Sequence, residues 1–273
     1  RRSILATVAH AALLPLACSQ QIPLTNNGPS DIHGTRVQWG GNTFLHLESE
    51  SWRKKKTLEM LAEAGLTWIK QHFPWADIEN AGKDNFLHPS WKVSNWDKYD
   101  EIVELAHVLG LNVIARIDRA PSWARPQHST ATEPPTNLDD YGDFISTIVR
   151  RYRGRVRHFQ IWNEPNLAFE WGGKSPDAVR YVRLLETAFA AAVAADPETV
   201  ILGAPLAATL EMSSRAQNEL TYLQNIYDAG GADYFHIHSA NAFGLSLPPE
   251  SPPSPDILNF RRVELSRAVM EQN

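Results

Sequence analysis

Hydrophobic and polar residues follow two alternating periods along most of the chain. In short runs such as 111–117 every second residue is apolar, which predicts a strand. In longer segments such as 138–152, apolar residues recur every three or four positions, which predicts an amphipathic helix. Gly65 and Gly110 are placed to stop the first two helices. We predict strands over 36–39, 66–73, 111–117, 156–162, 200–204 and 234–238, and helices over 51–64, 96–109, 138–152, 176–195, 216–229 and 255–271.

Six strand–helix repeats without a long all-β or all-α block predict an α/β fold with a mostly parallel sheet and right-handed crossovers. A doubly wound sheet and an eightfold (β/α)8 TIM barrel both fit this pattern. The turn after the first strand contains Gly40-Gly41 but no G-x-G-x-x-G motif. Its absence argues against a dinucleotide-binding fold. Long loops follow four of the six strands at what would be one rim, as in a barrel active site.

Side-chain alternation predicts a polar interior for the barrel. Alternate residues of a strand share a face, and each of four strands has one polar and one apolar set. The apolar sets should pack under the helices, so the polar sets should face inward. Buried charges cost several kcal/mol each unless they are paired, so Lys70, Arg116 and Asp118 have a structural interpretation as an ion-pair layer. The polar residues nearest the rim are the better functional candidates: His72, Asp118, Glu164 and His238.

The hexapeptide 161–166, Ile-Trp-Asn-Glu-Pro-Asn, ends the fourth predicted strand. Pro165 stops the strand, because proline lacks the N–H that a ladder needs and restricts the residue before it. Glu164 is therefore expected at the carboxyl end of a strand, where α/β barrels bind their ligands. A strand-end Glu that merely begins a loop is the structural alternative, but the flanking Asn and Trp residues favour a sugar-processing acid.

Composition narrows the choice of partner and compartment. A net charge of −5 argues against a nucleic-acid partner. The single cysteine, Cys18, excludes a disulfide framework and a thiolate metal site. Residues 1–18 combine a basic start, an apolar stretch and a small residue before Cys18, which resembles a bacterial lipoprotein signal. We therefore expect an exported protein, extracellular or periplasmic, with a possible lipid anchor at Cys18 and a polar linker over 19–35.

Five motifs lie at the ends of predicted strands: 73–79 (FPWADIE), 119–123 (RAPSW), 162–166 (WNEPN), 170–173 (EWGG) and 241–244 (NAFG). They resemble motifs of the clan A glycoside hydrolases, the retaining (β/α)8-barrel group. The family 39 xylosidase/iduronidase-like and family 5 cellulase-like enzymes are the most similar. The resemblance covers Val37 to the end of the sequence, and the Asn-Glu-Pro motif is its specific element.

The resemblance implies a hydrolase of O-glycosidic bonds with a carbohydrate substrate and neither a cofactor nor a metal. It implies that Glu164 is the general acid/base and that Asn163 binds the hydroxyl next to the reacting carbon. Trp75, Trp123 and Trp171 lie on rim loops, where they would stack on sugar rings or pack the loops. Phe243 stands where the clan often has an aromatic hydroxyl. His72, Asp118, His238 and Asn241 are the other expected substrate-binding residues.

The nucleophile of this clan is a Glu at the tip of the seventh strand. Residues 36–273 provide about six βα units, so strands seven and eight and this Glu are missing. We therefore expect an incomplete barrel, from a truncated gene product or a fragment, that is inactive alone.

Two other hypotheses remain. One is a carbohydrate-binding remnant without a nucleophile. The other is a metal-dependent barrel hydrolase, because His236 and His238 would share a strand face.

Overall fold

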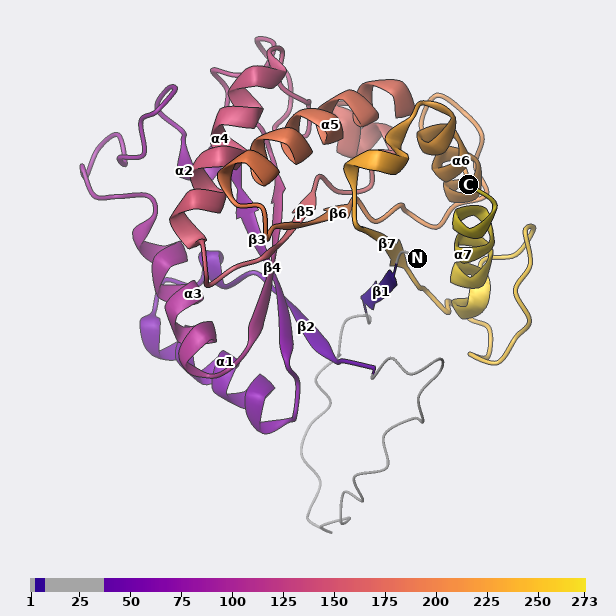
Figure 1. Ribbon diagram of the computed structural model, residues 1–273, viewed down its shortest axis with the longest axis horizontal. Coiled ribbons are helices and arrows are strands. Elements are labelled where there is room, and N and C mark those ends of the chain that lie inside the picture. Colours follow the sequence, from indigo (N-terminus) through magenta and orange to yellow (C-terminus); the bar gives the residue numbers. More distant parts are fainter. Residues whose placement is uncertain (1–2, 8–36) are drawn as a thin grey trace.

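The protein is described by a computed structural model that covers residues 3–7 and 37–273 (Figure 1). Its strands form one parallel sheet in the order β1-β7-β6-β5-β4-β3-β2. The sheet curves around a central axis and the helices cover its outer face (Figure 1). The strands are β1 (Ser3–Thr7), β2 (Gly40–Thr43), β3 (Trp68–Pro74), β4 (Asn112–Asp118), β5 (His158–Ile161), β6 (Val200–Gly203) and β7 (Ile237–Asn241).

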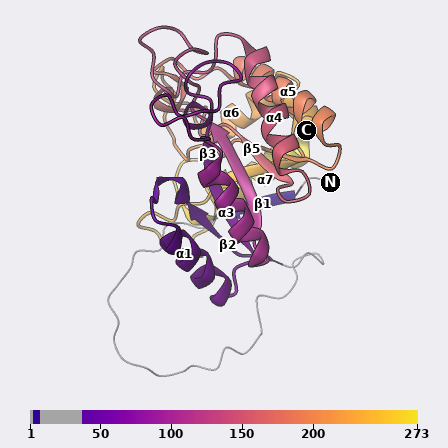
Figure 2. The same cartoon turned by 90° about the vertical axis from the view of Figure 1, so that its left-hand side faces the viewer.

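Strands β2 to β7 and the helices after them form six βα units, which match an incomplete (β/α)8 barrel. The predicted fold class is thus confirmed, and the doubly wound alternative is excluded. Figure 2 shows α1 and α3 beside the β2–β3 side of the sheet. The helices are α1 (Ser51–Glu63), α2 (Trp75–Ile78), α3 (Asp97–Val108), α4 (Leu138–Tyr152), α5 (Ala178–Ala195), α6 (Glu219–Asp228) and α7 (Val263–Gln272). Short 3-10 turns are η1 (Leu45–Leu47), η2 (Ala168–Trp171), η3 (Gly231–Tyr234) and η4 (Phe260–Arg262).

The core fills the layer between the sheet and its helices. Apolar strand residues such as Ile69, Phe73 and Ile117 are fully buried there. Phe73 stacks on Tyr99 of α3 with ring centroids 5.0 Å apart. Several helices start at a side chain that caps free backbone N–H groups; Asn137, for example, accepts from the backbone N–H of Asp139 at 3.0 Å at the start of α4.

Three predicted boundaries need correction. The first strand is residues 40–43, not 36–39, and its glycines pair with β3. A Cβ on Gly40 would lie 2.8 Å from the Cβ of Trp68, so only glycine permits this close pairing. The last strand begins at Ile237 because η3 occupies Gly231–Tyr234. The last helix begins at Val263, and the residues where its start was predicted are held instead by the Arg262 guanidinium, which donates to the Ser254 and Pro255 carbonyls, both at 2.7 Å.

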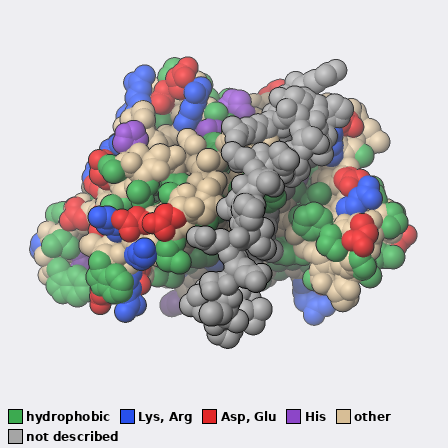
Figure 3. All heavy atoms as spheres, turned by 90° about the horizontal axis from the view of Figure 1, so that it is seen from below, with side chains coloured by type: hydrophobic (Ala, Val, Ile, Leu, Met, Phe, Trp, Pro, Cys, Tyr) green, Lys and Arg blue, Asp and Glu red, His purple; other side chains and the backbone are tan. Residues whose placement is uncertain are grey.

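The predicted export signal, residues 1–18, falls mostly outside the described residues, as do Cys18 and the linker over 19–35. Of this region the structure describes Ser3–Thr7, which form β1 and pair with β7 from Ile237 to Asn241. No helix in the described residues is long and apolar enough to cross a membrane. On the face seen in Figure 3, acidic and basic side chains are interspersed.

Candidate active site

The hexapeptide forms a strained turn at the carboxyl end of β5. Trp162 and Glu164, on either side of Asn163, have φ values of +70° and +43°. Residues other than glycine rarely adopt this backbone conformation. It costs about 1–3 kcal/mol per residue and persists only where the surroundings impose it. Here they do: the Trp162 N–H donates to the Ile117 carbonyl at 3.0 Å, and the Glu164 N–H donates to the Pro205 carbonyl at 3.0 Å. The turn is fixed to the ends of both neighbouring strands.

Asn166, the last residue of the motif, has a structural role. Its side chain is fully buried. The amide nitrogen donates to the carbonyls of Ala207 and Gln217, both at 2.9 Å, and the amide oxygen accepts from the Ala207 N–H at 2.9 Å. Because buried amides need such partners, Asn166 joins the loop after β5 to the loop after β6.

The Glu164 side chain is half-buried and faces the end of β7. The Asn241 amide donates to Glu164 Oε1 at 2.6 Å. Burial raises the pKa of Glu164, and the nearby Glu170 carboxylate raises it further, while Arg116 and Lys70 act in the opposite direction. Glu164 therefore binds a proton more readily than an exposed Glu, with one of its oxygens fixed by Asn241.

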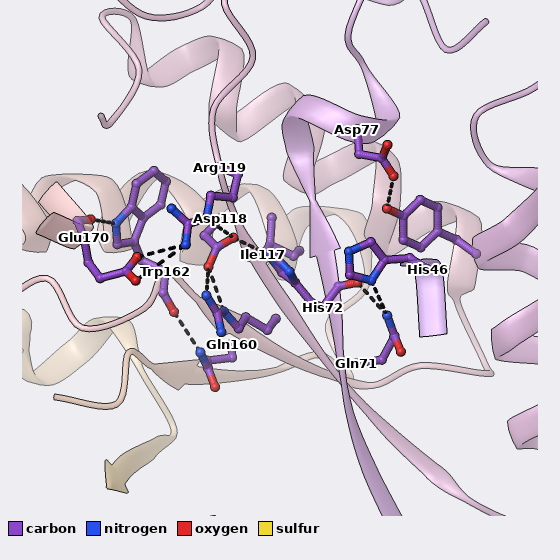
Figure 4. Close-up of polar contacts among 12 residues, drawn as sticks. His46, Gln71, His72, Asp77, Ile117, Asp118, Arg119, Gln160, Trp162 and Glu170 are labelled. Atoms are coloured by element: carbon purple, nitrogen blue, oxygen red, sulfur yellow. Dashed lines mark hydrogen bonds and ion pairs between the residues drawn. The ribbon is translucent and has the colours of Figure 1, made fainter. Parts of the chain in front are cut away.

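An ion-pair layer lies below this rim, in register across neighbouring strands (Figure 4). His72 Nε2 lies 2.5 Å from Asp118 Oδ1, and Arg116 binds Asp118 Oδ2 through Nε at 2.7 Å and Nη2 at 2.6 Å. Burial alone would raise the pKa of Asp118, but the His72 hydrogen bond and the Arg116 charge hold it well below its usual value. The predicted inward polar sets of β3 and β4 thus meet inside the barrel.

Lys70 differs from the other charges of this layer. Its side chain is buried, yet among the described residues it forms no ion pair. Burial and the nearby Arg116 lower the pKa of Lys70 to about 8, against the attraction of Glu164 and Asp118. A buried ammonium without a carboxylate partner is unfavourable, so this position near Glu164 is suited to a further anion.

Glu170 belongs to the site although sequence reasoning did not include it among the candidates. It lies in η2, and its carboxylate Oε2 is 3.3 Å from Arg119 Nη2 (Figure 4). The Asn163 side chain also interacts with this carboxylate. The only sequence signal was a carboxylate within the EWGG motif, next to the strand-end Glu.

The structure places the three rim tryptophans in packing positions. Trp75 and Trp171 have 0% exposure, and the Trp75 indole donates to Glu79 Oε2 at 2.6 Å. Trp123 is half-buried and donates to the Glu79 carbonyl at 2.7 Å. Trp75 and Trp171 thus have no free face for a sugar, so loop packing, the alternative to stacking, describes them. Phe169, by contrast, is 76% exposed beside Glu170.

His238 does not face the barrel interior as predicted. It lines a small cavity with Arg262, Val263 and Ser266, so it lies between β7 and α7. Asn241, three residues later, has the opposite parity on the strand and is the residue that reaches Glu164. Burial lowers the pKa of His238 to about 4, which keeps it neutral near pH 7.

His236 is also turned away from a shared metal position. Its Nδ1 accepts from the Ile201 N–H at 2.9 Å, and its ring lies 5.3 Å from that of Phe189 on α5. In the described residues no group of three or more His, Cys, Asp or Glu side chains is arranged to hold a metal ion. The metal-dependent hypothesis therefore has no support from the geometry of this histidine pair.

Gly172 ends the turn that carries Glu170, and we expect Gly172→Ala to destabilise the protein strongly. Its φ is +70°, and an added Cβ would lie 2.8 Å from the Cα of Glu133. Left-handed backbone costs about 1–2 kcal/mol for an L-residue, and overpacking adds about 1–3 kcal/mol. Gly173→Ala is the matched control, because Gly173 has φ +79° but no atom within 4 Å of the new Cβ. Urea unfolding measures both, and equal losses would contradict the predicted clash.

Comparison with known proteins agrees with this fold. The family model for cellulase (glycosyl hydrolase family 5) matches residues 29–218, more than half of the 273-residue chain. Among curated proteins none matches the sequence.

Several solved structures share the fold. A family 39 glycoside hydrolase from Bacteroides cellulosilyticus has a TM-score of 0.59 at 18% identity, over 81% of this chain and 42% of its own. A monomeric beta-xylosidase from Caulobacter crescentus has a TM-score of 0.58 at 21% identity, over 86% and 48%. A GH39 enzyme from Xanthomonas axonopodis pv. citri has a TM-score of 0.58 at 18% identity, over 85% and 47%.

The chain spans less than half the length of these three solved chains. At such low identity the likeness shows the fold alone, whereas the family model covers the strand-end motif itself. The chain therefore belongs to the cellulase family of glycoside hydrolases, glycosyl hydrolase family 5, and folds as an incomplete (β/α)8 barrel of clan A.

Proposed function

We propose that this protein takes part in the retaining hydrolysis of O-glycosidic bonds in an oligosaccharide or polysaccharide, with Glu164 as the general acid/base. The observation that carries the proposal is the state of the Glu164 carboxyl, which is half-buried at the carboxyl end of β5 with a raised pKa. A general acid is most effective when its pKa lies near the operating pH, and burial is how carboxyl groups are brought there.

The geometry gives the two oxygens of Glu164 different roles. Oε1 accepts a hydrogen bond from Asn241, so the proton of the acid form belongs on Oε2. That proton passes to the departing glycosidic oxygen, and the resulting carboxylate then removes a proton from the water that completes the reaction. Asn163 lies directly before Glu164 in the strained turn. By the resemblance to clan A, it binds the substrate hydroxyl next to the reacting carbon.

The nucleophile in this proposal is a second carboxylate about 5–5.5 Å from Glu164, as retaining enzymes require. Lys70 supports this, because its buried ammonium forms no ion pair in the described residues, although Glu164 and Asp118 attract it from a greater distance. Glu170 is a poor candidate, since it belongs to the same loop as Glu164 and is paired with Arg119. We propose that the nucleophile comes from the seventh strand of a complete barrel.

Export and a lipid anchor at Cys18 remain part of the proposal, on the sequence pattern alone. They would place the protein where polysaccharides are degraded outside the cytoplasm. The solved structures that share the fold include a GH39 beta-xylosidase, which makes xylo-oligosaccharides suitable first substrates alongside cello-oligosaccharides.

We expect the 273-residue chain alone to hydrolyse aryl glycosides only marginally, because it supplies the acid/base without the nucleophile. The measurement is nitrophenol release from a panel of aryl β-xylosides and β-glucosides, with binding of xylotriose and cellotriose followed by calorimetry. Binding without turnover would also fit a carbohydrate-binding remnant, so the decisive step is to restore a complete barrel. Robust nitrophenol release by the chain alone would contradict the missing-nucleophile assignment.

A further inference from the structure

The turn that carries Glu170 is held rigidly against the hexapeptide. The Trp162 indole donates to the Glu170 carbonyl at 3.0 Å. The Trp171 ring packs against the Trp162 ring, with centroids 5.9 Å apart and both rings buried. The backbone of Glu170 is therefore fixed relative to the strand end that carries Glu164.

A buried carboxylate from a different loop anchors the far end of this turn. Glu133, in the loop before α4, is 1% exposed. It binds Lys174 Nζ at 2.6 Å and Arg180 Nη2 at 3.3 Å, and it packs against Gly172. A pair between a buried carboxylate and two cations fixes position better than a surface pair. The loop after β5 is thus tied down on both sides of Glu170.

The Glu170 carboxylate points back toward the active site. Its side chain is 11% exposed and lies 3.3 Å from Arg119 Nη2, while Arg119 Nε lies 3.9 Å from Asp118. The same carboxylate interacts with the Asn163 side chain, the residue directly before Glu164. Burial raises the pKa of Glu170, and the Arg119 charge and the Asn163 hydrogen bond oppose that rise. Figure 4 shows Glu170, Arg119 and Asp118 in one chain of contacts at the rim. An ion pair that served only the surface would not require a buried Glu170 side chain, nor one that points toward the residues around Glu164.

We propose that Glu170 is a positioning residue of the active site, which orients Asn163 and Arg119 and places a second negative charge beside Glu164. The role of this charge follows from elementary electrostatics, because a neighbouring carboxylate favours the protonated form of an acid. Arg116 and Lys70, from β4 and β3, face Glu164 with the opposite effect, and Asn241 of β7 contributes a neutral donor. Glu170 thus opposes the effect of Arg116 and Lys70 on Glu164 and favours the protonated form of Glu164, which can donate its proton.

The test is a carbon-13 NMR titration of the Glu164 carboxyl in the 273-residue chain. Glu170→Gln should move the midpoint of that titration to lower pH, because the neighbouring charge is removed. Arg119→Gln should move it to higher pH, because Glu170 loses its counter-ion. In the double variant the effect of Arg119→Gln should largely disappear, since it acts through Glu170.

Glu133→Gln is the structural control, because it loosens the same loop without altering a charge at the rim. It should lower the free energy of unfolding while shifting the Glu164 midpoint less than Glu170→Gln does. An unchanged midpoint in Glu170→Gln, or an equal shift in Glu133→Gln, would overturn the proposal. If Glu170→Gln does not fold, Arg119→Gln decides alone, and a midpoint that stays in place or falls would overturn it.

The consequence for catalysis rests on the proposed function of Glu164, whereas the titration does not. In a hydrolytically active form, Glu170→Gln should shift the alkaline limb of the kcat profile to lower pH, and Glu170→Asp should partly restore it. A shifted titration without glycoside hydrolysis would leave the role of Glu170 intact and contradict the proposed function instead.

Discussion

Glu164→Gln, in a form of the protein whose barrel is complete, is expected to lower kcat on natural oligosaccharides by about 10²–10⁴-fold, the usual contribution of general acid–base catalysis. Glutamine keeps the shape of the side chain and can still accept from the Asn241 amide, which donates to Glu164 Oε1 at 2.6 Å. It cannot supply the proton that an unactivated sugar leaving group requires. Steady-state kinetics on xylo- and cello-oligosaccharides measure the loss.

The same variant should treat activated substrates differently. A dinitrophenolate leaves without protonation, so the first step should be largely spared on dinitrophenyl glycosides. The second step still needs a base to activate water, so a covalent intermediate should accumulate. A burst of dinitrophenol followed by slow turnover would be the signature, and this split between the steps separates loss of the acid/base from general damage to the fold.

The direction in which kcat should change with pH follows from the pKa of Glu164. Burial and Glu170 raise the pKa of Glu164, and only the protonated form donates. The kcat for unactivated substrates should therefore fall as pH rises through this raised pKa.

Glu211→Gln is the control, since Glu211 is a carboxylate on the loop after β6 that pairs with Arg215 at 3.1 Å rather than with the site. Full activity of Glu164→Gln on an oligosaccharide would refute the assignment.

Much of the fold could be predicted because its helices are strongly periodic and well bounded. The helix predicted over 138–152 was found with both ends in place. There an N-cap Asn precedes the helix, and five large apolar residues share one face. Strands four to seven residues long carry less information, and each pairs with residues far away along the chain, as Trp68 of β3 does with Asn112 of β4. The inward polar sets were nonetheless predicted for β3 and β4, where His72 and Arg116 meet in register.

The last strand shows where sequence reasoning fails. Over 234–238 the polar His236 and His238 alternate with apolar residues, which favoured an inward His238, whereas beyond residue 238 the polar residues Ser239 and Asn241 fall on the other parity. The strand covers this second stretch, Ile237–Asn241, because η3 occupies Gly231–Tyr234, and Asn241 is the residue that reaches Glu164. The Trp residues posed a similar problem, since the sequence does not distinguish an indole that packs a rim loop from one that binds a sugar.

Glu170 could not be predicted, because its role depends on contacts with Arg119 and Asn163 that only the folded loops create.

A second large effect is expected from Asp118→Asn in the ion-pair layer, which should lower the free energy of unfolding by about 3–5 kcal/mol, the range for removing one partner of a buried pair. Asp118 is 2% exposed and holds both Arg116 and His72. Without the carboxylate, the Arg116 guanidinium remains buried with a neutral amide as its partner. Urea unfolding at pH 7 measures the loss. Asp100→Asn is the control, because Asp100 pairs with Arg151 at the surface, where such pairs contribute about 0–1 kcal/mol.

The pH dependence of stability provides an independent check on the same residue. The pKa of Asp118 lies well below its usual value in the folded protein, so the unfolded chain binds this proton at a higher pH than the folded one does. The stabilisation from Asp118 is therefore complete above the ordinary pKa of an Asp, about 4, and is lost progressively as pH falls below it. Asp118→Asn should flatten this acid limb, while Asp100→Asn should leave it steep. If the free energy of unfolding of Asp118→Asn still falls equally steeply at low pH, carboxylates other than Asp118 must be responsible for that fall. The ion-pair layer would then not be what stabilises the strand ends that carry Glu164.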